Sequence, residues 1–390
     1  MKQKRRKKRS LFAPLQKWIV KFISKEKHTH PDYVLLGMTF LLLLLGLMIL
    51  TSASSVVALR QFDDSYFFLK QQLMQGVFLG VVGAIVLYNI SIEWLQKWSF
   101  HIFLFSLVLL ILVLIPQFGD TRLGASRWLN LGPLSFQPSE VVKFTFVLYL
   151  AAWLTKQKDY IKDFKTTFIP FVIVLCVVGG LLILQPDMGT MGIFVLIALT
   201  MYFVAGGHLG HLALLGVGGM TAVWLLIKAA PYRAARLTTF LNPELDPQGL
   251  GYHINQALLA IGSGGFFGKG LGHSRQKFQY LPEVYGDSIF AVMAEELGFL
   301  FTLIIVGLFV YYFIRGFQVA GKVPHTYASL LAIGIVAWLG WQTIVNIGAM
   351  VGLLPLTGVP WPLVSYGSTA LAINLSSIGL VLSISRQMKQ

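Results

Sequence analysis

The stretch YVLLGMTFLLLLLGLMILTSASSVVAL, residues 33–59, decides the class of this protein. It contains no Lys, Arg, Asp or Glu, and a helix needs only about 20 such apolar residues to cross a hydrocarbon core about 30 Å thick. The rest of the chain is similar, because 56% of its 390 residues are hydrophobic and 12% are charged, with a mean hydropathy of +0.71. This composition excludes a soluble globular enzyme. The one cysteine, Cys176, lies in an apolar run, which excludes a disulfide framework and a Cys-based metal site.

Uncharged intervals of comparable length recur along the chain and predict further membrane spans. Two more spans, near 138–155 and 288–314, carry charged residues close to one end. The last uncharged interval, 323–385, holds two helices around a loop at 352–367 that is rich in Pro and Gly. We therefore predict an all-α polytopic membrane protein of about ten transmembrane helices. The remaining spans fall in 33–59, 71–92, 98–119 and 166–186, with two more in 188–227 separated at Gly206–His211.

Basic residues predict the orientation, because short cytoplasmic loops carry an excess of Lys and Arg. The net charge is +15, and much of it lies in the first 27 residues. We place this tail, residues 1–32, in the cytoplasm with an amphipathic helix on the inner leaflet, although a basic tail that only sets topology explains the charge equally well. The basic cluster has no accompanying fold that would support nucleic-acid binding.

Because successive spans cross the membrane in opposite directions, the cytoplasmic tail fixes on which side of the membrane each later segment lies. The lysines at 156–165 and the C-terminal residues 387–390 fall in the cytoplasm, so both termini lie inside. The membrane domain is 33–386, and its long extracytoplasmic loop, between helices 7 and 8, covers about 228–287. Charged and polar residues gather in the outer loops, which predicts a site on that side.

Two of these outer segments begin helices. In QPSEVVK, residues 137–143, Glu140 and Lys143 share one helix face. A Lys directed into a helix bundle is costly and favours a functional role, while a local ion pair with Glu140 is the alternative. Asp187, at the start of the sixth span, fits a helix N-cap as well as a site residue.

The long loop supplies the other candidates. It contains Arg233 and Arg236, its apolar residues 250–262 predict a short interfacial helix, and its Gly-rich stretch lacks the P-loop pattern. The loop ends at Asp287, which fits an N-cap of the eighth helix. A carboxylate beside cations also suits a general base acting next to a polyanionic group. These residues point to a phosphate-bearing lipid or glycolipid as the ligand.

A series of ordered motifs across residues 33–386 resembles the SEDS family, which comprises FtsW, RodA and SpoVE. The motifs are GASRW (124–128), QPSE (137–140) with Lys143, QPDMGT (185–190), the 242–249 stretch, AIGSGG (260–265), LPE (281–283) with Asp287, PLTG (355–358) and SYGS (365–368). YFFLKQQL (66–73) and GHSRQKF (272–278) look closer to the division type, FtsW, than to the elongation type. The chain departs from the family pattern around Asp287, where YGDSIF replaces HTDFIF.

The resemblance implies a membrane glycosyltransferase that polymerises lipid II into peptidoglycan strands on the outer face of the bacterial cytoplasmic membrane. Asp287 matches the essential carboxylate of the family. It would accept the proton of the acceptor 4-hydroxyl while undecaprenyl diphosphate leaves with inversion at the anomeric carbon. The implied substrate-binding residues are Arg127, Glu140, Lys143, Asp187, Arg233, Arg236 and Glu283. A flippase for lipid-linked precursors and a non-enzymatic scaffold for division proteins are the alternative functions.

The resemblance also implies partners and a location. The partners are lipid II, undecaprenyl-diphosphate-linked glycan, a class B penicillin-binding transpeptidase and other division proteins, at the division septum. A diphosphate beside Asp and Glu favours Mg²⁺ or another divalent cation, although no motif requires one. No organic cofactor is expected.

Overall fold

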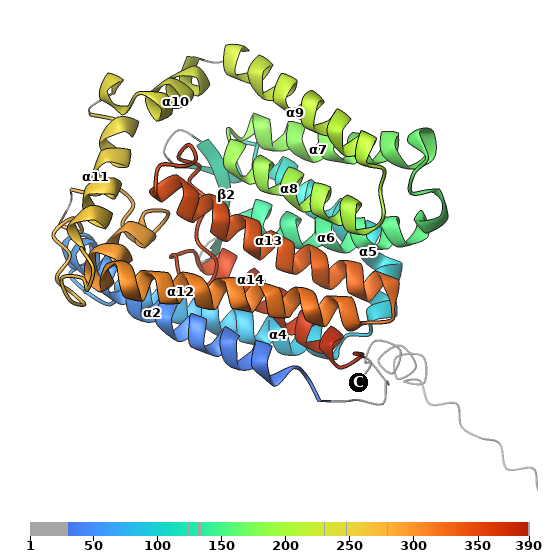
Figure 1. The fold of residues 1–390 in the computed structure, drawn as a ribbon, viewed down its shortest axis with the longest axis horizontal. Helices are drawn as coiled ribbons and strands as arrows, with labels where there is room; N and C mark the ends of the chain where they lie inside the picture. The colour runs from blue at the N-terminus through green and yellow to red at the C-terminus, as the bar shows by residue number, and fades with distance from the viewer. Residues whose placement is uncertain are drawn as a thin grey trace, which may run out of the picture.

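The computed structural model describes residues 30–122, 125–131, 134–229, 231–246, 248–278 and 280–388. The amphipathic helix predicted for the basic tail lies outside these residues. The elements below belong to the described part of the chain and keep the labels of Figure 1.

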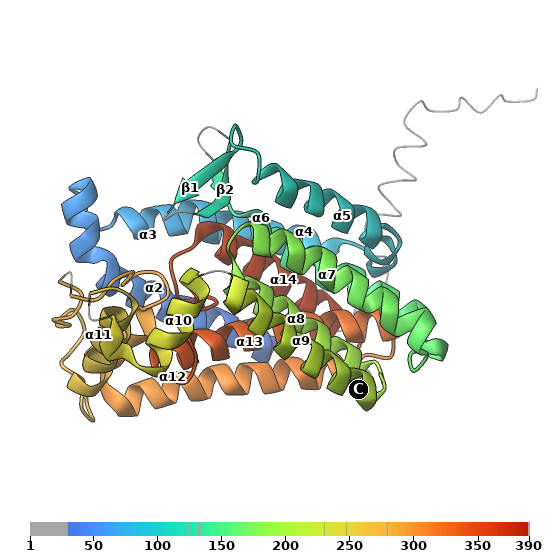
Figure 2. The ribbon, with the colours of Figure 1, turned by 90° about the horizontal axis from the view of Figure 1, so that it is seen from above.

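The architecture is a helix bundle, which confirms the predicted polytopic membrane fold. Eight of the described helices are long and apolar enough to cross a membrane. Two further helices, α6 and α8, lie between them, so the bundle contains the ten helices expected among the described residues (Figures 1 and 2). They are α2 (Tyr33–Phe62), the continuous α3 (Phe67–Gln71), η1 (Gln72–Phe78) and α4 (Leu79–Asn89), α5 (Ile92–Leu112), α6 (Pro138–Lys156), α7 (Ile169–Leu184) after η3 (Phe164–Phe168), α8 (Met188–Val204), α9 (Leu209–Ala229), α12 (Ile289–Lys322), α13 (Thr326–Met350) and α14 (Ser368–Ser385).

Successive helices alternate in direction, so the loops collect at two ends of the bundle (Figure 1). We call one end the outer end; it holds the described residues of the segments 63–66, 113–137, 185–187, 231–288 and 351–367. The lysines at 156–165, Lys322 and Arg386 lie at the opposite end. The two groups of residues that the sequence assigned to different sides of the membrane are therefore separated by the length of the bundle.

The core of the bundle is formed by α13 and α14. In the spanning windows of these helices 72% and 78% of residues are buried, against none in that of α9. Helices α6 and α8 pack against α13, and α14 packs against α4. Because a helix facing lipid needs no polar partners for its backbone, α9 can run along the edge of the bundle with its apolar surface exposed.

The outer end also contains a small antiparallel sheet, which was not predicted from the sequence. Leu129 pairs with Phe136 in the second ladder of the sheet. Pairing satisfies the backbone groups of a loop that has no helical periodicity. The strands are β1 (Gly119–Arg122), β2 (Ala125–Leu131) and β3 (Leu134–Phe136), in the order β1-β2-β3.

The long outer loop is largely helical. The helix expected at 250–262 is present as α11 (Leu250–Ser263). The loop also forms α10 (Pro231–Leu241) and a single turn, η4 (Pro243–Leu245), which were not predicted. These elements lie across the outer end between α9 and α12 (Figure 1).

The eighth spanning helix, α12, is interrupted at Gly298, whose φ of 75° and ψ of 178° are not helical. The break frees main-chain groups that an intact helix would pair, and the loop after α11 pairs them instead. The N–H groups of Phe299 and Leu300 donate to carbonyls of this loop at 2.9 and 3.1 Å, and Lys269 and Gly270 donate to carbonyls before the break. The first two turns of α12 are thus oriented by the outer loop.

We expect Gly298→Ala to destabilise the protein by about 1–3 kcal/mol, because a Cβ there would lie 2.1 Å from the main-chain nitrogen of Gly268 and the φ is left-handed. Gly307→Ala on the same helix is the matched control, since its added Cβ meets no atom within 4 Å. Thermal unfolding midpoints of the two purified variants test this. Equal midpoints would contradict the role assigned to Gly298.

Candidate active site at the outer end

Asp287 lies at the outer end immediately before α12, but it is not the N-cap of that helix. Ser288 occupies the N-cap position, so the N-cap alternative for Asp287 was wrong. The Oδ1 atom of Asp287 is buried and has no hydrogen-bond partner among the described residues. The main chain of Asp287 is held by Asn346 on α13, whose Nδ2 donates to the Asp287 carbonyl at 2.9 Å. The carboxylate therefore has one buried oxygen without a hydrogen-bond partner, on a backbone that Asn346 fixes.

His253 on α11 supports this segment from the other side. Its Nε2 lies 2.6 Å from the Ser288 hydroxyl, which donates to the carbonyl of Pro282 at 2.8 Å. Because the one hydroxyl proton is used on Pro282, the imidazole Nε2 carries the proton that joins His253 to Ser288. Burial lowers the pKa of His253, which keeps the ring neutral. Sequence reasoning missed His253, because a lone His on a helix carries no motif.

The electrostatics bring three of the predicted residues together. Burial raises the pKa of Asp287 to about 6, against the opposing effect of nearby main-chain N–H groups and the positive charge of Arg236. Burial and the charge of Asp287 also raise the pKa of Glu283 above its usual value. A carboxyl that titrates near neutral pH is suited to accept a proton and release it again.

Lys143 is placed elsewhere, inside the bundle. Its Nζ lies 2.8 Å from Glu140 Oε2 and donates to Gln342 Oε1 on α13 at 2.9 Å; Lys143 is 1% and Glu140 2% exposed. Trp338 also donates to Gln342 Oε1, at 2.8 Å. The ion-pair alternative therefore describes Lys143 in this structure, with α13 contributing to the pair.

A polar ladder on α13 links this ion pair to Asp287. Gln342 and Asn346, one turn apart, donate to the carbonyls of Pro360 and Val359 at 2.9 Å each. Both amides thus fasten the last outer loop, while one contacts Lys143 and the other contacts the main chain of Asp287. Neither amide was predicted. The available signal was two uncharged polar residues at helical spacing inside an otherwise apolar span.

The last outer loop is also joined to the segment that precedes Asp287. The N–H of Tyr366 donates to the carbonyl of Tyr285 at 2.8 Å, and Phe68 stacks on Tyr285 with ring centroids 4.4 Å apart. The backbone before the carboxylate is therefore packed between α3 and the 351–367 loop.

Three other predicted residues have hydrogen-bond partners away from Asp287. Asp187 caps α8 by accepting from the N–H of Thr190 at 3.2 Å, which is the N-cap role considered for it. Arg127 on β2 donates from Nε to the carbonyl of Gln185 at 3.2 Å and also donates to Pro186. Arg233 on α10 donates to the carbonyl of Leu226 at the end of α9, at 3.1 Å. The structure does not bring Arg127, Lys143 or Asp187 into hydrogen-bond contact with Asp287.

Within the described residues, no three His, Cys, Asp or Glu side chains form a group able to hold a metal ion by themselves. Glu283 and Asp287 are the acids that lie near each other at the site. Mg²⁺ is commonly bound by one or two carboxylates together with substrate phosphates. The divalent cation stays a prediction.

Comparison with known families shows to which family the chain belongs. The model of a family of cell cycle proteins, FtsW/RodA/SpoVE, matches residues 33–390. The chain belongs to this family. Within the FtsW/RodA/SpoVE family, stage V sporulation protein E of Bacillus subtilis is 40% identical over 92% of this chain and 98% of its own length. A probable peptidoglycan glycosyltransferase FtsW of Trichlorobacter lovleyi is 39% identical over 92% of this chain and 94% of its own.

Solved structures of the family share the fold. A chain from a complex described as a peptidoglycan synthase that coordinates polymerization and crosslinking has a TM-score of 0.75 at 28% identity, over 91% of this chain and 98% of that chain. The rod shape determining protein RodA of Thermus thermophilus has a TM-score of 0.67 at 28% identity, over 92% and 98% of the two chains. The chain is therefore a multi-pass membrane protein of the FtsW/RodA/SpoVE family.

Proposed function

We propose that this protein is a peptidoglycan glycosyltransferase that polymerises lipid II on the outer face of the cytoplasmic membrane. The observation that carries the proposal is Asp287. Its carboxylate has a buried oxygen without a hydrogen-bond partner and a pKa of about 6, and its backbone is fixed by Asn346 and the Ser288–His253 pair. The names of the FtsW relatives supply the reaction class.

In the proposed reaction, Asp287 accepts the proton of the 4-hydroxyl of the lipid II acceptor as that oxygen attacks the anomeric carbon of the growing chain. The bond from that carbon to the diphosphate breaks, and undecaprenyl diphosphate leaves with the bonding electrons, so configuration inverts. Arg236 is the cation placed to stabilise charge beside Asp287, with Arg233 on the same helix. A divalent cation on the leaving diphosphate is an additional proposal, with Glu283 and Asp287 as the available carboxylates.

Purified protein in detergent with lipid II separates this proposal from the flippase alternative. A polymerase forms glycan without a membrane, whereas a flippase forms no product. The acidic residues within α12 favour the enzyme, because Glu295 and Glu296 pair with Lys269 and Lys277 of the outer loop rather than lining a path through the bundle. If the folded protein forms no glycan from lipid II, the proposal is wrong. If cells that carry Asp287→Asn divide normally, the scaffold alternative is supported.

The pH dependence gives a further prediction. We expect kcat/KM to fall below about pH 6, since protonation of Asp287 removes the base. The positive charge of Arg236 lowers the pKa of Asp287, so Arg236→Gln should move this acidic limb to higher pH. The measurement is the pH at which kcat/KM falls to half of its maximum, and not the maximum value of kcat/KM. A limb unmoved by Arg236→Gln would contradict the pairing of these two groups.

We further propose that the protein acts in septal synthesis with a class B penicillin-binding transpeptidase. The support is the similarity to FtsW relatives and to a chain of a peptidoglycan synthase complex. Copurification of the tagged chain with a penicillin-labelled protein from dividing cells tests the partnership. A tagged chain that is spread evenly around the cell would count against the septal role.

The orientation has its own test. Gln248 and Asp159 are exposed at opposite ends of the bundle. We expect single cysteines at these positions, in a Cys176→Ser background, to react with an impermeant thiol reagent from outside and only after lysis, respectively. The reverse pattern would place the site in the cytoplasm and exclude a substrate on the outer face.

A further inference from the structure

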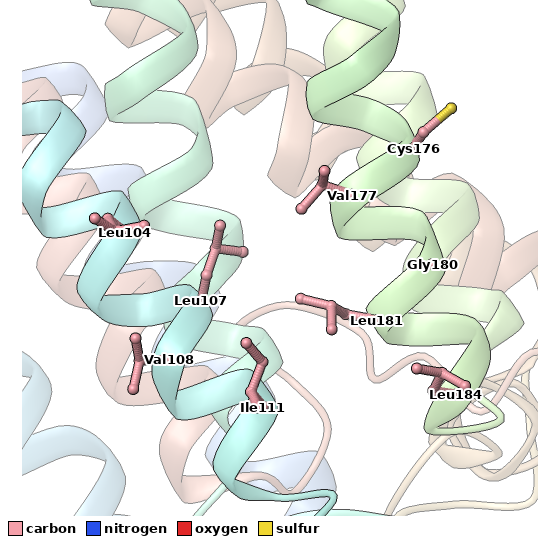
Figure 3. Close-up of a pocket in the computed structure, with 9 residues that line it drawn as sticks. All are labelled: Leu104, Leu107, Val108, Ile111, Cys176, Val177, Gly180, Leu181 and Leu184. Atoms are coloured by element: carbon pink, nitrogen blue, oxygen red, sulfur yellow. The ribbon is translucent and has the colours of Figure 1, made fainter.

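A groove on the lipid-facing side of the bundle lies between α5 and α7. It is an open groove with a volume of roughly 610 Å³. It is lined by apolar side chains of α5 between Leu104 and Ile111, and by residues of α7 between Cys176 and Leu184. Figure 3 shows Leu107 and Ile111 facing Val177 and Leu181 across the gap. Gly180 borders open space, because a Cβ at that position would meet no atom within 4 Å.

The outer end of this groove is closed by polar contacts. The side chain of Gln185, which follows α7 directly, is buried and donates from Nε2 to the carbonyl of Leu110 on α5 at 2.7 Å. This contact joins the two helices next to Ile111 and Leu184, the outermost lining residues. The groove therefore ends at a defined point instead of running out into solvent.

Arg127 lies at that point. Its guanidinium donates to the carbonyls of Gln185 and Pro186, so it is fixed beside the closed outer end of the groove and remains only partly buried. The two carbonyls carry no net charge, which leaves the positive charge of Arg127 available to an anion. An apolar groove below a fixed guanidinium matches a lipid with a phosphate head and a long hydrocarbon tail.

We propose that the α5–α7 groove holds the polyprenyl tail of one of the two lipid-linked substrates, with Arg127 on its diphosphate. The inference rests on the proposed function, because joining a growing chain to lipid II requires two polyprenyl diphosphates at once. Arg236, on α10 beside Asp287, is available to the diphosphate of the other substrate. Arg127 is on β2, and β2 lies apart from α10 and α11 at the outer end (Figure 2). Two separated cations thus serve two diphosphates.

Photocrosslinking tests the occupant directly. Position 177 faces the gap and lies about 10 Å below Leu184 along the helix axis, at the level of a lipid tail. We would attach benzophenone maleimide to purified Val177→Cys in a Cys176→Ser background, add lipid II and irradiate. Gly307→Cys on α12, exposed on another helix, is the matched control in the same background.

The expected result is a lipid II adduct at position 177, absent from the α12 control, which excess undecaprenyl phosphate suppresses at least fivefold and phosphatidylglycerol does not. Arg127→Gln should weaken this adduct severalfold. Equal suppression by phosphatidylglycerol would show that ordinary acyl chains fill the groove and would overturn the proposal, as would the absence of an adduct. Because crosslinking needs no turnover, a specific adduct on an inactive protein would leave the groove assigned and reject the polymerase.

Blocking the groove gives an independent readout. Gly180→Trp should fill it and raise the KM for lipid II about tenfold with little change in kcat, because the tail loses its packing site while the chemistry is untouched. Gly307→Trp is the matched control, since that position is also open. An unchanged KM for Gly180→Trp would overturn the tail assignment even where the polymerase is active.

Discussion

Asp287→Asn is expected to abolish most polymerase activity, by at least about 100-fold in kcat, while the protein accumulates normally in the membrane. Asn has nearly the volume of Asp and keeps the main-chain carbonyl that Asn346 binds, but it cannot accept the proton. Because Ser288 is the N-cap of α12, the substitution removes no helix cap. The rate of glycan formation from lipid II in detergent measures the effect, beside the thermal midpoint of the same sample.

Two controls make this result specific. Asp287→Glu keeps a titratable group but moves it by about 1 Å, so it should retain little activity. Glu283→Gln changes the neighbouring acid and tests whether that residue is the base instead. If Asp287→Asn polymerises lipid II at the wild-type rate while Glu283→Gln does not, the roles of the two carboxylates are reversed.

Lys143→Met is expected to have the second large effect, on folding. Removing the ammonium leaves Glu140 as a buried charge without its cation, and breaking such a pair costs about 3–5 kcal/mol. We expect a sharply lower yield and thermal midpoint. Lys70→Met is the matched control, because Lys70 pairs with Asp64 on the exposed surface and its loss should change the midpoint little.

The double substitution Glu140→Gln with Lys143→Met separates two roles for the pair. It removes both charges, so folding should recover. If the pair only positions α13 through Gln342, activity should recover with folding. A double variant that folds but does not polymerise lipid II would instead show that the positive charge of Lys143 acts on the substrate, as the sequence first suggested.

Local sequence was sufficient for the spans. The predicted break at Gly206–His211 covers the turn between α8 and α9 and the first three residues of α9. The start of α6 at Pro138 was predicted from its QPSE motif, and the helix predicted at 250–262 is α11. The capping role of Asp187 was also a local inference. The small sheet at 119–136 was missed, because its short strands have no apolar alternation strong enough to separate them from a loop.

The sequence by itself determined the class of the protein and the number of spans, and it predicted the end of the bundle at which the candidate site lies, because hydropathy and charge act residue by residue along the chain. Only the tertiary structure decided which polar groups meet. Gln342 lies 199 residues from Lys143 and Asn346 lies 59 from Asp287, so no local pattern could pair them. A buried polar group must find a partner wherever packing places one. The partners of Asp287 and Lys143 therefore follow from how α6, α12 and α13 pack, and not from the sequence motifs in which the two residues were found.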